Sequence, residues 1–143
     1  MKSFLRYLPL AALLFAPSAL ADGQSESDGC LRTKIWSDYK DGWAVRTAVD
    51  HTLMLGEKKI FLVTLYAGNK YKFQACGDSK SVDLDLVLHD ATGTTRTFDG
   101  TENKEPEIVF TPDKTDTYYV SVFLGKAVED DASSHFSMAV QYQ

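Results

Sequence analysis

Apolar and polar side chains alternate along most of the chain after residue 42, with the period of two that half-buried β-strands produce. About eight segments show this alternation or a short β-branched apolar run: residues 43–49, 59–66, 70–76, 82–89, 94–98, 107–111, 117–124 and 135–142. Turns rich in glycine, aspartate and asparagine separate them. Because no long helical pattern alternates with these segments, we predict an all-β fold, an antiparallel sandwich or barrel, and not a parallel α/β sheet.

The residues before this region follow a different pattern. Residues 30–42 are mixed, and Leu31, Ile35 and Tyr39 fall on one side of a short helix, so we expect a short irregular or helical segment there. Residues 22–29 (DGQSESDG) are small and polar, which predicts a flexible leader.

The first 21 residues have the features of a secretory signal peptide. A basic start (Lys2 and Arg6) precedes an apolar stretch over residues 8–20, and Ala-Leu-Ala at 19–21 matches a cleavage site. The apolar stretch is short for a membrane span. We therefore expect export, with cleavage before Asp22, to the periplasm or beyond the cell. The predicted organisation is a signal peptide over 1–21, the leader over 22–29 and one domain over 30–143.

Charge narrows the classes of partner. Removing Lys2 and Arg6 leaves 13 basic and 20 acidic residues, a net charge of −7. A negative surface argues against nucleic acid, and against a membrane after signal cleavage. A protein or glycan partner stays compatible with this charge.

The chain has two cysteines, Cys30 and Cys76, both in the exported part. In an oxidising compartment two cysteines most simply form one disulfide. That bond would enclose about 45 residues and stabilise the fold by roughly 4 kcal/mol in the chain-entropy model. The two thiols lack the C-x-x-C spacing and histidine partner of a zinc site.

Two carboxylates stand on one strand, in the stretch SVDLDLVLHD (81–90). Leu84, Leu86 and Leu88 share the core face, so Asp83 and Asp85 share the other face, roughly 6.6 Å apart along the strand. They either face water and hold loop amides, or they bind a hard cation together with oxygens from nearby turns. The ligand set we consider for Ca²⁺ is Asp83, Asp85 and Asp90.

Aromatic residues supply the other candidate surface. Trp36 and Tyr39 stand in the segment that the strand pattern does not explain, and Tyr119 follows Tyr118 on a strand, so that one of the two must point away from the core. We take Trp36, Tyr39 and Tyr119 as candidate binding residues. The sequence has no G-x-S-x-G or H-E-x-x-H motif, and we predict no catalytic residue.

Three stretches resemble a known family: LYAGNKYKF (65–73), DLDLVLHDATG (83–93) and DTYYVSV (116–122). Together they are similar to the bacterial pre-peptidase C-terminal domain, which is related to the collagen-binding domains of secreted collagenases, and the resemblance extends over about the last 90 residues. Asp116 departs from the glycine that is usual in the family. The resemblance implies a jelly-roll-like β-sandwich, here as a stand-alone exported domain, and some members of the family bind calcium.

These observations predict a non-enzymatic exported binding module for protein, peptide or glycan, with Ca²⁺ as the one candidate cofactor. An alternative is a small periplasmic inhibitor or immunity protein that binds one enzyme or toxin, for which the acidic loop at residues 125–134 is the candidate contact. A second alternative is a hydrolase with a dispersed site.

Overall fold

The structure is a computed structural model that describes residues 20–143, so the predicted signal peptide lies almost entirely outside the described residues. Within that range one helix comes first and eight strands follow. The elements are α1 (Leu20–Tyr39), β1 (Ala44–Met54), β2 (Lys58–Leu65), β3 (Tyr71–Gly77), β4 (Ser81–His89), β5 (Thr95–Asp99), β6 (Glu107–Phe110), β7 (Asp116–Ala127) and β8 (Ser133–Tyr142). Each predicted strand segment corresponds to one of these strands, so the prediction of an all-β fold is confirmed.

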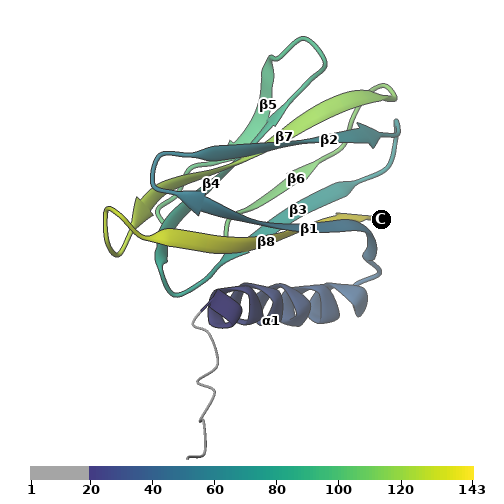
Figure 1. The fold of residues 1–143 in the computed structure, drawn as a ribbon. Helices are drawn as coiled ribbons and strands as arrows, with labels where there is room; N and C mark the ends of the chain where they lie inside the picture. The colour runs from purple at the N-terminus through teal and green to yellow at the C-terminus, as the bar shows by residue number, and fades with distance from the viewer. Residues whose placement is uncertain (1–19) are drawn as a thin grey trace, which may run out of the picture.

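The strands form two antiparallel four-stranded sheets that pack face to face (Figure 1). We call β1-β8-β3-β6 the helix-covered sheet, because α1 lies against its outer face, and β2-β7-β4-β5 the open sheet. Apart from the β4–β5 hairpin, consecutive strands alternate between the two sheets. This alternation produces the strand order of a jelly roll, a double sheet made of two Greek keys.

The space between the sheets holds the main apolar core. Side chains from both inner faces are fully buried there, among them Leu65, Phe73, Leu86, Val120 and Phe136. Burying a side chain of this size contributes about 1.5–3 kcal/mol. The alternation along β7 is clear, because Tyr118 is buried in this core while Tyr119 points to the outer face of the open sheet.

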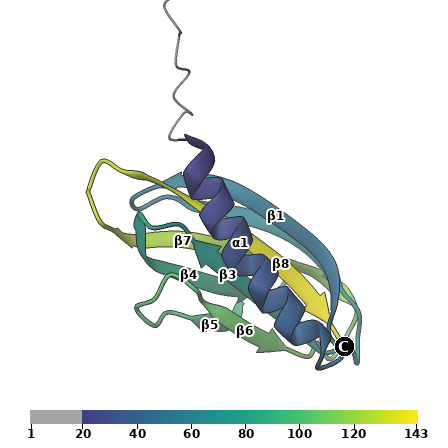
Figure 2. The same ribbon diagram turned by 90° about the horizontal axis from the view of Figure 1, so that it is seen from below.

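Helix α1 lies on the outer face of the helix-covered sheet, over β8 and β3 (Figure 2). Its apolar contact is small: Leu31, Cys30 and Ile35 pack on Cys76 and Ala139. A helix with so little apolar contact needs other links to stay in place. Among residues 20–143, no helix has the length and apolar content required to cross a membrane.

The predicted disulfide between Cys30 and Cys76 is present and is one of those links. It joins the middle of α1 to β3 across a sequence separation of 46 residues. The disulfide prediction is therefore confirmed.

The prediction of a flexible leader over residues 22–29 is wrong, because the structure continues α1 back through them. Their polar side chains have partners in the sandwich that composition alone does not reveal. The Ser27 hydroxyl lies 3.0 Å from that of Ser137, and Glu26 accepts a hydrogen bond from the Ser79 amide at 2.6 Å. Tertiary contacts therefore order a segment whose composition is typical of disorder.

Candidate functional site

The outer face of the open sheet carries a row of mostly apolar side chains. Strand register places Ile60, Ser121, Val87 and Phe98 side by side across all four strands. Phe98 is 65% exposed and Ile60 is 46% exposed, while the small Ser121 between the larger neighbours is buried. The exposed part of the row is therefore made by its apolar members, with the buried Ser121 between Ile60 and Val87.

A second row lies beside the first. Leu62, which is 68% exposed, stands next to Tyr119, and Tyr119 stands next to His89. Ile60, Tyr119, His89 and Gly93 line a shallow hollow between the two rows. We call the residues Ile60, Leu62, Val87, Phe98 and Tyr119 the apolar face. Large apolar side chains exposed together mark an interaction surface more often than the same residues scattered singly.

Carboxylates border the apolar face at one end. Asp83 and Asp85 point outward from β4, as the sequence predicted, and both lean over Gly125 of β7. A Cβ atom at Gly125 would lie 3.1 Å from Asp83 Oδ2 and 3.7 Å from Asp85 Oδ2, so glycine leaves the room that these carboxylates occupy. Burial, together with the charges of Asp83 and Asp99, raises the pKa of Asp85.

The third carboxylate of this group is Asp99, and not the predicted Asp90. Strand β5 returns antiparallel to β4 and places Asp99 opposite Leu86. Burial alone would raise the pKa of Asp99, but hydrogen bonds from Thr101 and the Glu107 amide hold it below its usual value. Asp83, Asp85 and Asp99 form what we call the acidic end of the open sheet.

Asp90 lies just beyond the opposite end of β4, where it organises the turn into β5. Its Oδ1 accepts hydrogen bonds from the Thr92 hydroxyl at 2.6 Å and from the Thr92 and Thr94 amides at 3.0 Å. These bonds, together with the charge of Arg96, lower the pKa of Asp90. The structure therefore does not bring the predicted ligand set of Asp83, Asp85 and Asp90 together.

The acidic end offers few oxygens to a calcium ion. Asp85 Oδ1 is buried and has no hydrogen-bond partner, whereas Asp83 and Asp99 already accept hydrogen bonds from backbone amides. Ca²⁺ requires six to eight oxygen ligands. Within residues 20–143, the one trio of cysteine, histidine or carboxylate side chains with ligand atoms inside 4.8 Å of one another is Cys30, Cys76 and Glu105. The described side chains therefore offer few free oxygens at this end, and the expected ligand set of Asp83, Asp85 and Asp90 is not gathered in one place.

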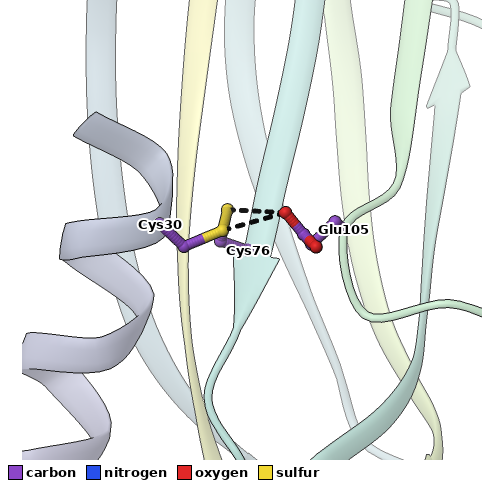
Figure 3. A group of neighbouring side chains, drawn as sticks. All are labelled: Cys30, Cys76 and Glu105. Atoms are coloured by element: carbon purple, nitrogen blue, oxygen red, sulfur yellow. Dashed lines mark hydrogen bonds between the residues drawn. A yellow bond between two sulfur atoms is a disulfide. The ribbon is translucent and has the colours of Figure 1, made fainter. Parts of the chain in front are cut away.

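That trio lies at the disulfide and does not form a metal site (Figure 3). Glu105 Oε1 lies 3.1 Å from Cys30 Sγ and 4.0 Å from Cys76 Sγ, and it forms an ion pair with Lys34 at 3.3 Å. The bonded sulfurs have no proton to donate and no thiolate to offer a metal. Glu105 is therefore a neighbour of the disulfide whose charge is paired with Lys34.

The three predicted binding aromatics lie on opposite sides of the molecule. Trp36 and Tyr39 are 71% and 67% exposed on the solvent side of α1, and their rings stack with centroids 5.9 Å apart. Tyr119 belongs to the apolar face of the open sheet. The structure brings the first two together and separates them from the third.

One histidine has partners that its sequence position did not suggest. His135 Nε2 lies 3.1 Å from Asp50 Oδ2, and His135 Nδ1 lies 3.1 Å from the Thr52 hydroxyl. The group borders a polar cavity of about 280 Å³ that also contacts Asp78 and Lys80. Strand register explains the contact, since Thr52 and His135 are direct cross-strand neighbours.

This arrangement has the order of hydroxyl, imidazole and carboxylate that hydrolases use, but three of the backbone amides around the cavity already have acceptors and so do not form an oxyanion hole. The Ser79 amide donates to Glu26, the Lys80 amide donates to Asp78 Oδ1, and the His135 amide donates to Asp78 Oδ2. Threonine is also a weak nucleophile unless it is activated. The cluster therefore links β1 to β8, and Gln24 of α1 joins it by donating a hydrogen bond to Asp50 Oδ2 at 3.0 Å. We assign it no catalytic step.

Comparison with known proteins shows the fold. No family model and no curated protein sequence matches the chain. Among solved structures, the chain is similar to PliG of Aeromonas hydrophila, a periplasmic lysozyme inhibitor of g-type lysozyme, with a TM-score of 0.55 and 10% identity over 70% of this chain and 88% of that one.

The chain is also similar to the pre-peptidase C-terminal domain of a collagenase from Bacillus anthracis. The TM-score is 0.53 and the identity is 13%, over 67% of this chain and 89% of that one. At such low identities the likeness concerns the fold alone. It supports the resemblance to the pre-peptidase domain at that level.

Proposed function

We propose that this chain is an exported, non-enzymatic binding domain whose apolar face covers a surface of a partner protein. The observation that carries the proposal is the uncovered outer face of the open sheet, where Leu62 and Phe98 are about two-thirds exposed and Ile60 about half exposed. The other sheet hides its outer face under α1. An apolar surface that no described element covers is suited to a partner.

The composition of the apolar face favours a protein over a glycan. Three of its five residues, Ile60, Leu62 and Val87, are aliphatic. They bury well against other apolar side chains but offer a sugar neither a flat ring nor a hydrogen bond, so only Phe98 and Tyr119 could stack on one. The acidic end beside them favours basic residues on the partner, in keeping with the net charge of −7 expected for the exported chain.

A more specific form of the proposal is an inhibitor of a secreted enzyme that acts on the cell wall. The likeness to PliG supports this form, since that protein is named as a periplasmic lysozyme inhibitor with the same kind of fold. The disulfide supports it too, because such bonds persist in the oxidising compartments where those enzymes act. Inhibition would need no catalytic group on this chain.

The test compares two charged variants. The double variant Leu62→Asp/Phe98→Asp places charge on the apolar face, while Val109→Asp places one on an exposed apolar residue of the helix-covered sheet. Each oxidised protein is immobilised and exposed to cell-envelope extract, and bound proteins are quantified. The proposal expects at least one protein that wild type and Val109→Asp retain and that the double variant loses at least tenfold.

Two results would separate the general proposal from its specific form. Purified g-type lysozyme, assayed with increasing amounts of the protein, should lose activity only if the inhibitor form holds. A partner that depends on Leu62 and Phe98 without lysozyme inhibition would keep the binding domain and remove the lysozyme target. If wild type, the double variant and Val109→Asp all retain the same proteins in equal amounts, the apolar face is not the binding surface.

A further inference from the structure

We infer that the solvent face of α1 is a second docking surface, which binds an acidic segment of a partner protein on the side of the domain opposite the apolar face. Its residues are Arg32, Trp36, Tyr39 and Lys40, which we call the basic aromatic face. This inference goes beyond the proposed function, because a domain with two such faces can hold two partners at once.

Helical spacing brings the residues of the basic aromatic face together. Arg32 and Trp36 are four residues apart on one side of α1, and Lys40 follows at the same interval directly after the helix ends, so the three border one groove. Tyr39 stacks on Trp36, with ring planes inclined by 19°. A shallow groove beside the ring of Trp36 is lined by Arg32, Thr33, Ile35, Ser37 and Lys40.

The fold itself does not use these side chains. Leu31 and Ile35 make the apolar contact between α1 and the sheet, whereas Trp36 and Tyr39 are about 70% exposed. The chain also has a second tryptophan, Trp43, and that one is buried beside Lys72. An aromatic pair that is exposed to water contributes little to the packing of the domain. We therefore look for its role in a contact with a partner.

Charge indicates the chemistry of the partner. The groove contains two cations and no carboxylate, although the exported chain is expected to carry a net charge of −7. None of the ion pairs formed within residues 20–143 uses Arg32 or Lys40. Two cations without ion-pair partners beside exposed aromatic rings complement a ligand that is both negatively charged and partly apolar.

A protein fits this face better than an anionic bilayer. Tryptophan, tyrosine and arginine are the residues most often responsible for affinity at protein interfaces. A helix that lies in a membrane surface needs an apolar stripe along its length. On α1 the exposed positions beyond the aromatic pair include Gln24, Ser25 and Thr33, whereas Leu31 and Ile35 pack toward the sheet.

The helix is also held firmly enough to serve as an interface. The disulfide fixes its middle at Cys30, and Asp38 fixes its end through hydrogen bonds from Lys72 and Gln74. Trp36 lies between these two links in the sequence. A surface presented on a fixed element loses less conformational entropy when it binds.

The experiment selects ligands without assuming the partner. A random 12-residue peptide display library is panned on the oxidised protein, and the selected peptides are synthesised for affinity measurements. We expect enrichment of Asp and Glu together with apolar residues. Affinity should fall at least tenfold in Arg32→Glu/Lys40→Glu and in Trp36→Ser, and should change less than twofold in Leu62→Asp/Phe98→Asp.

The controls make each outcome decisive. The substituted side chains are at least partly exposed, so thermal midpoints close to the wild-type value will show that the variants fold. The inference is overturned if no acidic peptide is selected, or if the selected peptides bind Arg32→Glu/Lys40→Glu as well as wild type. It is also overturned if phosphatidylglycerol vesicles bind through Trp36 while acidic peptides do not. Loss of binding only in Leu62→Asp/Phe98→Asp would support the proposed function and reject this second surface.

Discussion

Asp38, in the last turn of α1, accepts a hydrogen bond from Lys72 Nζ of β3 at 2.8 Å, and each of the two side chains is only 12% exposed. Gln74 donates a second hydrogen bond to Asp38 at 2.6 Å, and Lys72 also lies 4.6 Å from the ring centre of Trp43. One carboxylate thus joins the end of the helix to the sheet beneath it. The disulfide provides the corresponding link in the middle of the helix.

Replacing Asp38 with alanine should therefore destabilise the domain. The change leaves the Lys72 ammonium without its partner in a mostly buried position and removes an acceptor from Gln74, so we expect a loss of about 2–4 kcal/mol in the free energy of unfolding. Urea denaturation followed by circular dichroism measures it. Asp41→Ala, at an exposed position three residues later, is the control and should change stability by less than about 0.5 kcal/mol. Equal effects of the two variants would contradict the role given to Asp38.

Reducing the disulfide should release α1 before it unfolds the sandwich. The apolar contact of the helix is limited to Leu31, Cys30 and Ile35, whereas the core between the sheets does not involve the helix. We expect the Cys30→Ser/Cys76→Ser variant to lose up to roughly 4 kcal/mol. Limited proteolysis should cut it first between residues 22 and 39. Cleavage that begins in the strands would show that the helix does not detach on its own.

Asp85→Asn should stabilise the protein at neutral pH. The pKa of Asp85 is raised in the folded state, so ionised Asp85 opposes folding above that pKa, and the penalty disappears as pH falls below the unfolded value near 3.8. The thermal midpoint of Asp85→Asn should exceed that of wild type at pH 7 and converge with it below about pH 4.

Asp90→Asn is the matched control for that measurement, and we expect it to shift the thermal midpoint in the opposite direction. The pKa of Asp90 is lowered by its hydrogen bonds, so its ionised form stabilises the fold above the unfolded value, and this contribution is lost as pH falls through the lowered pKa. Asp90→Asn should therefore melt below wild type at pH 7. Shifts of the same sign in both variants would contradict the two assignments.

Calcium should leave the thermal midpoint nearly unchanged. Asp83 and Asp99 are engaged with backbone amides and Asp90 lies beyond the far end of β4, so few of these carboxylate oxygens are free for the six to eight bonds that Ca²⁺ requires. Melts with millimolar Ca²⁺ and with excess chelator test this expectation. A ligand at 100 times its dissociation constant adds about 2.7 kcal/mol, a shift of several degrees. Such a shift, lost in Asp83→Ala/Asp85→Ala, would establish a calcium site.

Local patterns predicted the strands because alternation reports directly on which side chains are buried. The same reasoning predicted that Tyr118 and Tyr119 point in opposite directions, as they do. The pairing of Cys30 with Cys76 followed from their number and the expected compartment. These features depend on neighbours in the sequence or on the absence of alternatives.

The features that sequence reasoning missed depend on register between distant strands. Asp99 lies near enough for its charge to raise the pKa of Asp85 because β5 folds back along β4. His135 contacts Asp50 because β8 pairs with β1, 85 residues away in the sequence. The first residues of α1 were missed for a related reason. Gly23 and Gly29 weaken the helical pattern in the sequence, and the contacts that order this part of the helix come from β8 and the β3–β4 turn. The identity of a single residue does not show which distant residue it will contact.

The position of the C-terminus has a practical consequence for measuring these interactions. Gln143 donates a hydrogen bond to the Asp41 carbonyl at 2.7 Å, which places the end of the chain beside the end of α1 (Figure 1). An affinity tag or sensor chip attached there would crowd Tyr39 and Lys40 and leave the open sheet turned toward the solution. Immobilisation through the C-terminus therefore suits binding studies of the open sheet, whereas studies of α1 call for an attachment point elsewhere.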